Sequence, residues 1–380
     1  MGSGKNVTLL TIILLLCLFF STLAFAIEDT FVGGETSAAD ATGAATPIAW
    51  LKAHQYSSGL VESQIGWPDH RSFTYDQAGA AIAFTASGNL SNARRVLSAM
   101  ASVQNTDGSW YDAYYSDTKA PWEWSKSSGN TTWMVLAINF YEKRTGDKQY
   151  AAYAMKALSW VKKRIETDTS SNCFGAVSLG QNFYNIPHPE NIFSTEHNLD
   201  AYSAFKTRAA LTTNLTRRAD YKAVAAKIKT FLTTEVWNGS AFYRGCNDNE
   251  LWLDTQPWGY MVLGSAYSAG LAFAEANMVN TIPWKGVNVT GFQYNNYDTA
   301  SVWVEGTGQM AAAYGLIGDT NSASFYLNEL KKTIRTDGGM PYSFNAIGGA
   351  IAWPDNLRYS SASSVFWYYF AKNKVNPFKP

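Results

Sequence analysis

Charged residues are scarce in this sequence. Asp, Glu, Lys and Arg make up 16% of the 380 residues, and 30 basic side chains are balanced by 30 acidic ones. Proteins that bind nucleic acid or anionic surfaces through electrostatics carry a basic excess on the binding face. We therefore expect no nucleic-acid partner.

Cysteine and histidine are also few, with three and four residues. Their spacing matches neither a zinc site nor a redox pair, so we expect no metal and no cofactor. Cys17 lies in the N-terminal segment, whereas Cys173 and Cys246 fall in two loops of the expected fold. In an exported chain two such cysteines either pair or remain free, and the sequence leaves both states open.

The N-terminal segment has the features of an export signal. Lys5 precedes an apolar run, which ends at the small-x-small sequence Ala24-Phe25-Ala26. This pattern predicts a signal peptide over residues 1–26, followed by a flexible lead-in over 27–45. The alternative is an uncleaved anchor, because the uncharged run is nearly long enough to span a membrane. In both cases we expect a secreted or periplasmic protein, with membrane contact only if the segment is retained.

Alternation typical of strands is sparse, and helical patterns follow one another along residues 46–380. Short turns, often with Gly or Asn, separate the two helices of a pair, and long loops separate the pairs. The pattern predicts an all-α chain. Helices are expected near 46–55, 74–86, 90–104, 130–144, 194–212, 217–236, 254–264, 301–317, 321–335 and 360–372, with one more that ends near 167 and another that ends near 279.

The first helix of each pair is apolar on nearly all sides, as in TWMVLAINF, whereas the second carries charges, as in YLNELKKTIRT. Helices that are apolar all round are buried, so the first helices are expected to form an inner ring. The unpaired helices at the two ends of the chain complete a sixth hairpin. The sequence therefore predicts a toroid of six helical hairpins, with all long loops at one end.

This layout, with SFTYDQAGAAIAF, QNTDGSWYDAY, STEHNLDAY and VWVEGTGQMAAAY, resembles the six-hairpin glycosidase-like superfamily of (α/α)6 toroids. The resemblance covers essentially the whole chain after the signal peptide. It implies a glycoside hydrolase, expected to be a monomer acting on a carbohydrate, and favours inversion at the anomeric carbon. Some polysaccharide lyases share the fold that this pattern resembles, so the fold alone does not decide the function.

Four acidic residues stand out at the starts of the otherwise uncharged inner helices. In STEHNLDA, Glu196 lies four residues before Asp200 on one helical face, an arrangement that costs stability unless it serves a purpose. Glycoside hydrolysis needs one protonated and one ionised carboxyl group across a sugar-binding cleft. We expect Glu196 and Glu305 to be the catalytic pair, with Asp76 and Asp254 next.

Aromatic side chains are abundant, at 15% of the sequence, and many lie in the long loops. Flat apolar rings suit pyranose faces, and amide or acidic groups suit hydroxyls. Some of these aromatic side chains are expected only to pack their loops against the toroid of helices. The loop aromatics are Trp67, Trp110, Trp122, Trp124, Tyr184, Trp252, Tyr294, Tyr297 and Trp353. The predicted substrate-binding residues are His197, Asn198, Asp200, Asn130, Trp133, Gln256, Trp258, Trp303, Gln309, Trp110, Trp124, Trp67, Arg358 and Tyr359.

Two alternatives remain open. A polysaccharide lyase would use His197 or Tyr359 as base, with Asn198 and Arg358 neutralising a uronate, although acidic residues crowded around the site oppose an anionic substrate. A non-catalytic carbohydrate-binding toroid would bind sugar without turnover.

Overall fold

The structure is a computed structural model that describes residues 46–183, 186–344 and 359–380. The predicted signal peptide and lead-in, together with Tyr184, Trp353 and Arg358, lie outside the described residues. The described part contains the helices α1 (Pro47–Ala53), α2 (Thr74–Ala86), α3 (Leu90–Ser102), α4 (Ser128–Thr145), α5 (Ala151–Lys162), α6 (Thr195–Leu211), α7 (Leu215–Thr234), α8 (Thr255–Leu263), α9 (Ala269–Asn277), α10 (Val304–Ile317), α11 (Thr320–Lys331) and α12 (Ala362–Asn373).

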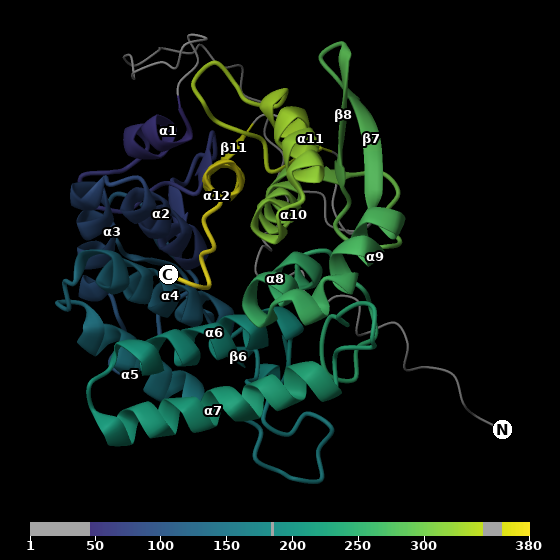
Figure 1. The fold of residues 1–380 in the computed structure, drawn as a ribbon. Helices are drawn as coiled ribbons and strands as arrows, with labels where there is room; N and C mark the ends of the chain where they lie inside the picture. The colour runs from purple at the N-terminus through teal and green to yellow at the C-terminus, as the bar shows by residue number, and fades with distance from the viewer. Residues whose placement is uncertain (1–45, 184–185, 345–358) are drawn as a thin grey trace.

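The even-numbered helices form the inner ring (Figure 1). Each packs on the next, from α2 through α4, α6, α8 and α10 to α12, and α12 packs on α2 to close the circle. The odd-numbered helices α3, α5, α7, α9 and α11 each pack outside the inner helix that precedes them, and α1 packs on α12. The sixth hairpin is thus made from the two ends of the described chain, as the sequence predicts.

Burial follows the composition of the two helix types. In α10, VEGTGQMAAAYGLI, every residue from Val304 to Gly315 is buried, whereas α3 buries only one face. Small residues let the inner helices approach closely. A Cβ atom on Gly79 of α2 would lie 2.3 Å from the ring of Phe366 in α12, so a larger residue there would require the Phe366 ring to move.

The short turns contain glycine where the chain needs a left-handed conformation. Gly146 and Gly318 end α4 and α10 with φ angles of 76° and 92°. A residue with a Cβ atom is strained in this conformation, which explains why glycine recurs in the short turns.

The long loops contain short strands that form a second ring above the helices. The strands are β1 (Gln64–Ile65), β2 (Arg71–Phe73), β3 (Ala113–Tyr115), β4 (Pro121–Glu123), β5 (Lys126–Ser127), β6 (Gly180–Gln181), β7 (Val279–Trp284), β8 (Val287–Phe292), β9 (Val302–Trp303), β10 (Ser343–Phe344) and β11 (Ser360–Ser361).

In each of six cases the residues just before an inner helix pair antiparallel with the loop that leads to the next inner helix. The pairs are β2 with β3, β5 with β6, Ser194 with Gly245, Trp252 with Asn295, β9 with β10, and β11 with β1. These pairings fix the start of every inner helix relative to its neighbour. These pairings are absent from the all-α prediction, because two-residue strands leave no periodic pattern in the sequence.

One longer hairpin also differs from the all-α prediction. Strands β7 and β8 pair along their whole length after α9 and project beyond the helices (Figure 1). Lys285 and Gly286 form the turn with positive φ angles of 45° and 81°. Positive φ at both central residues is the geometry of a tight hairpin turn, and the β-branched residues around it suit strands.

A disulfide joins Cys173 to Cys246, which settles the pairing that the sequence left open. It ties the loop before α6 to the loop before α8, at the end of the toroid where the inner helices begin. Among the described residues, no helix is both long and apolar enough to cross a membrane.

Candidate active site

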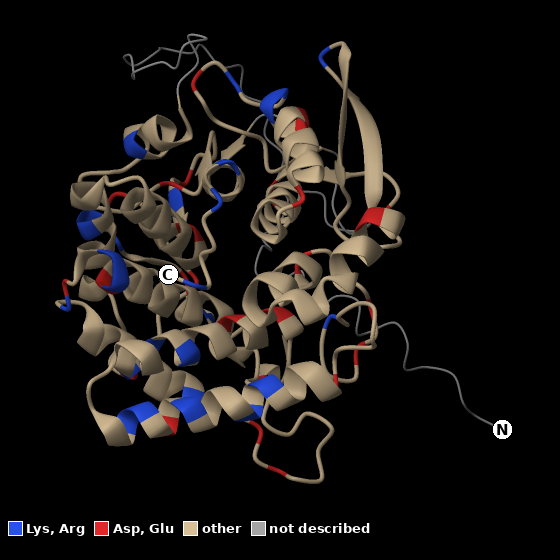
Figure 2. Ribbon diagram, in the orientation of Figure 1, with Lys and Arg blue, Asp and Glu red and all other residues tan. Residues whose placement is uncertain are grey.

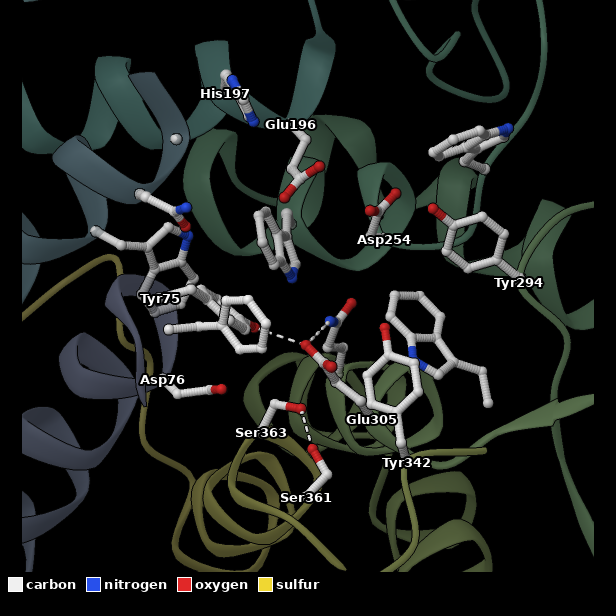
Figure 3. Close-up of a pocket in the computed structure, with 18 of the residues that line it drawn as sticks. Tyr75, Asp76, Glu196, His197, Asp254, Tyr294, Glu305, Tyr342, Ser361 and Ser363 are labelled. Atoms are coloured by element: carbon white, nitrogen blue, oxygen red, sulfur yellow. Dashed lines mark hydrogen bonds between the residues drawn. The ribbon is translucent and has the colours of Figure 1, made fainter. Parts of the chain in front are cut away.

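A cavity of about 140 Å³ opens where the inner helices begin. It is lined by four carboxyl groups, by aromatic rings, and by amide, hydroxyl and imidazole side chains (Figure 3). Of the predicted site residues, those that line it are Asp76, Asn130, Trp133, Glu196, His197, Asp254, Trp258, Trp303, Glu305 and Gln309.

A repeated hydrogen bond explains why these side chains converge. In five inner helices a side chain near the start donates a hydrogen bond to the backbone carbonyl oxygen four residues earlier. The bonds run from Gln77 to Phe73, from Thr132 to Ser128, from Asn198 to Ser194, from Gln256 to Trp252, and from Thr307 to Trp303. The residue two positions before each donor lines the cavity; these residues are Tyr75, Asn130, Glu196, Asp254 and Glu305. Equivalent positions on successive inner helices therefore supply the site.

The donors themselves point away from the cavity. Asn198 accepts from the Val177 amide at 2.7 Å and donates to the Val177 carbonyl at 3.0 Å. Gln256 makes the same pair of contacts with Phe242, at 2.9 and 2.8 Å. The predicted sugar-binding role of both residues therefore needs correction: their amides are occupied by loop backbone and hold the loops on the helix starts.

Glu305 lies at the end of a hydrogen-bonded chain. The Trp367 indole donates to the Tyr75 hydroxyl at 2.6 Å, and Tyr75 donates to Glu305 Oε1 at 2.7 Å. Gln309 donates to the same oxygen at 3.3 Å. Burial raises the pKa of Glu305 to about 7, although hydrogen bonds from Ser363, Tyr75 and Gln309 oppose the rise. Because these donors prefer the ionised carboxylate, Glu305 is suited to accept a proton.

Glu196 has the opposite environment. Its carboxyl group points across the cavity from α6 toward Glu305 on α10 (Figure 3), and no described residue donates a hydrogen bond to it. Burial raises the pKa of Glu196 well above its ordinary value, and the charges of Asp254 and Glu305 raise it further. Glu196 is therefore suited to hold a proton and to donate it.

Asp254 and Asp76 complete the group of four carboxyls. The Thr255 amide donates to Asp254 at 2.7 Å, but burial still raises the pKa of Asp254 to about 7. Burial likewise raises the pKa of Asp76 well above its ordinary range. Asp200 does not line the cavity. It is fully buried one turn beyond Glu196. Burial raises the pKa of Asp200 well above its ordinary value, and the charges of Glu196 and Asp254 raise it further.

His197 lines the cavity as a neutral ring, because burial lowers its pKa to about 4. Neither lysine nor arginine lines the cavity among the described residues. In the same part of the chain, no group of His, Cys, Asp and Glu residues is arranged to hold a metal ion.

The aromatic residues divide between the cavity and the packing of the loops. Trp133, Trp258 and Trp303 line the cavity, as do Trp252 and Tyr294. Phe378, from the C-terminal segment, packs against Trp133 and Trp258, with ring centroids at 5.3 and 5.4 Å.

Several predicted aromatic residues do not line the cavity. Trp110 is fully buried and donates to the Met100 carbonyl at 2.7 Å. Trp124 is 60% exposed and packs on Tyr111. Trp67 packs on Tyr359 and lies under the Arg71 guanidinium. These rings hold loops in place, because each has a partner outside the cavity; Trp122 and Tyr297 also lie outside the lining.

Some lining residues were not predicted as site residues. They include Gln64, Phe73, Tyr75, Phe183, Tyr342 and Ser363. Tyr75 and Ser363 occupy the same helix position as Glu196 and Glu305, so the spacing of the inner-helix starts was a usable signal. The others come from loops, where no spacing rule applies.

Comparisons with solved structures agree with this architecture. A glycosidase in which a glutamate is replaced by alanine matches with a TM-score of 0.65 and 14% identity, over 88% of this chain and 96% of that chain. A novel alpha-amylase from Clostridium perfringens matches with a TM-score of 0.61 and 10% identity, over 87% of this chain and 96% of that chain. A bacterial glucoamylase complexed with acarbose matches with a TM-score of 0.63 and 13% identity, over 88% of this chain and 56% of that chain.

No family model and no curated protein matches the sequence. The identities to solved structures are low, so these matches show the fold. The chain has the (α/α)6 toroid of the six-hairpin glycosidase-like fold, which glycoside hydrolases share.

Proposed function

We propose that the protein is a glycoside hydrolase in which Glu196 is the general acid and Glu305 the general base. One observation carries the proposal: two glutamates line the same cavity from different helices in unlike environments. Tyr75 and Gln309 donate to Glu305, whereas Glu196 has no donor among the described residues. Such a pair supplies both charge states that glycoside hydrolysis requires.

In the proposed step, the Glu196 proton passes to the glycosidic oxygen as the bond from that oxygen to the anomeric carbon breaks. Glu305 takes a proton from a water molecule, whose oxygen bonds to the same carbon. Each turnover leaves Glu196 ionised and Glu305 protonated, and exchange with solvent restores both. This route inverts the anomeric configuration, which NMR of the first-formed product detects.

The rest of the lining suits a neutral sugar. Trp133, Trp258 and Trp303 offer ring faces, and Asp76 and Asp254 offer oxygen acceptors for hydroxyl groups. A glycosidase of this fold solved with glucose, with a TM-score of 0.62, supports a hexose in the pocket. A family 76 glycoside hydrolase from a bovine Bacteroides thetaiotaomicron strain, with a TM-score of 0.57, also supports the assignment to glycoside hydrolases.

We also propose that the enzyme acts outside the cytoplasm, as a monomer. The predicted signal peptide supports export, and the disulfide between Cys173 and Cys246 supports an oxidising compartment. If the N-terminal segment is not cleaved, the same domain would be held at a membrane surface.

The test is reducing-sugar release from neutral and uronic polysaccharides, with absorbance near the unsaturated-uronate band read in parallel. The proposal predicts release from a neutral glycan without new absorbance. Absorbance that rises with release would instead identify a lyase. Binding of a glycan without release from any member of the panel would identify a non-catalytic toroid.

A further inference from the structure

A second concave surface lies between α6 and α7, away from the candidate active site. It is an open groove of about 580 Å³ and shares no lining residue with the cavity. Its floor consists of alanines and the Tyr202 ring, and its rims carry Lys206, Arg218, Lys222 and Lys229. No acidic residue lines it among the described residues.

The basic side chains of this groove lack acidic partners. None of Lys206, Lys222 and Lys229 has a carboxylate oxygen within ion-pair distance in the described part of the chain, whereas Lys126, Lys162 and Lys332 do. Arg218 donates only to the Thr212 carbonyl, at 2.7 Å. The groove thus has several positive charges and no internal counter-charge.

The charges also crowd one another. Arg218 and Lys222 are four residues apart on α7, a spacing at which like charges repel. Lys379 adds a further cation near Lys206: burial lowers the pKa of Lys379, and the charge of Lys206 lowers it further. The overall net charge is zero, so this concentration is a local feature. Figure 2 shows the basic segments along α7 and on the facing α6.

The position of the groove separates it from catalysis. Glu196 lies at the start of α6, and Lys206 lies ten residues further on, about 15 Å along the helix axis. Lys379 directly follows Phe378, which packs against Trp133 and Trp258 of the cavity lining. The groove and the cavity share no lining residue, so a molecule bound in the groove would leave the cavity open.

We propose that this groove binds an acidic polysaccharide and thereby anchors the enzyme to an anionic matrix. A groove receives a polymer chain, whereas a membrane surface cannot enter one. Lys222 and Lys229 lie about 10 Å apart along α7, a spacing that carboxylates on an extended glycan can match. Tyr202 is the one aromatic residue that lines the groove in the described part of the chain, whereas single-stranded nucleic acid stacks successive bases on several rings.

The test compares the purified full chain with two triple variants. Lys206→Gln/Lys222→Gln/Lys229→Gln removes the groove charges, and Lys143→Gln/Lys148→Gln/Lys163→Gln removes three exposed lysines elsewhere, so that the net charge changes equally. Binding of oligogalacturonate is measured by calorimetry at two salt concentrations. Hydrolysis of a small neutral substrate and melting temperature are measured for all three proteins.

The proposal predicts salt-sensitive binding by the parent chain and by the control variant, and at least tenfold weaker binding by the groove variant. Hydrolysis is expected to be equal in all three. Equal losses in both variants would overturn the proposal, because they would show non-specific attraction. Absence of binding by the parent chain would also overturn it, as would groove-dependent binding to phosphatidylserine vesicles without binding to oligogalacturonate.

Discussion

Glu196 and Glu305 are the same residue type, and burial raises the pKa of both, but among the described residues only Glu305 has hydrogen-bond donors that favour its ionised form. Three neighbours, Tyr75, Gln309 and Ser363, lower the pKa of Glu305 against its burial, whereas burial and two nearby carboxyls all raise that of Glu196. Function at this scale depends on the hydrogen-bond donors, because burial raises the pKa of both side chains and, in the described part of the chain, only Glu305 has donors that oppose the rise.

Replacing Tyr75 with Phe removes the hydroxyl that donates to Glu305. Because that bond lowers the pKa of Glu305, its loss raises the pKa, and the acidic limb of kcat/KM moves to higher pH. A hydrogen bond to a charged group is worth about 1.5 kcal/mol, which corresponds to a shift of about one pH unit. The pH profile of kcat/KM measures the shift.

Tyr326→Phe is the matched control, since the Tyr326 hydroxyl donates to Glu275 at 2.8 Å, far from the cavity lining. An unchanged acidic limb in Tyr75→Phe would mean that Glu305 does not act in its ionised form.

The sequence identified the four carboxyl groups because they stand out in helices that are otherwise uncharged. The sequence could not show that the Glu196 side chain lines the cavity and the Asn198 side chain does not, because both residues lie in the first turn of the same helix. Their directions differ only because Asn198 meets the Val177 backbone of a preceding loop. That contact depends on how a long loop folds back, which helical spacing does not encode.

At the scale of elements, two repeated devices build the site. The antiparallel pairing before each inner helix fixes its start. In α2, α6, α8 and α10 a buried amide or hydroxyl near the first turn also holds the adjoining loop. The sequence predicted the helices, their pairing and the ring, because apolar periodicity and alternating loop length are long-range patterns. It missed the hairpin β7–β8 and the short strands, whose pairings join distant segments.

Asn198→Ala tests this structural role. The change leaves the Val177 amide and carbonyl without their partner in a buried position, which costs about 2 kcal/mol or more. The expected result is a lower melting temperature with an unchanged KM for the folded enzyme. Asn277→Ala is the control, because the Asn277 side chain also donates to the carbonyl four residues earlier but is exposed. A raised KM without a change in melting temperature would contradict the structural role and would indicate that Asn198 binds the sugar.

At the scale of the whole molecule, the toroid concentrates carboxyl groups in one buried place, which makes stability depend on pH. Folding raises the pKa of Glu305 from 4.5 to about 7. Between these two pH values the folded state binds more protons than the unfolded chain. Its stability therefore falls as pH rises through that window.

Glu305→Gln removes the contribution of Glu305 to this dependence, and the contributions of Glu196, Asp254 and Asp76 remain. At pH 8 the variant is expected to be more stable than the parent chain by about 1–3 kcal/mol, and at pH 4 the difference should vanish. Chemical denaturation at the two pH values measures it, with Glu235→Gln as an exposed control. A variant less stable than the parent at pH 8 would contradict the assigned direction of the pKa shift.

The most direct test of the central claim measures kcat/KM of Glu196→Gln and Glu305→Gln on aryl glycosides of the active sugar with leaving groups of different acidity. A general acid matters less when the leaving group departs without a proton. We predict that Glu196→Gln loses about 10²–10⁴-fold on poor leaving groups but far less on a dinitrophenyl glycoside. Glu305→Gln should lose similarly on all of them. Recovery on the dinitrophenyl substrate by Glu305→Gln, or by neither variant, would contradict the assignment.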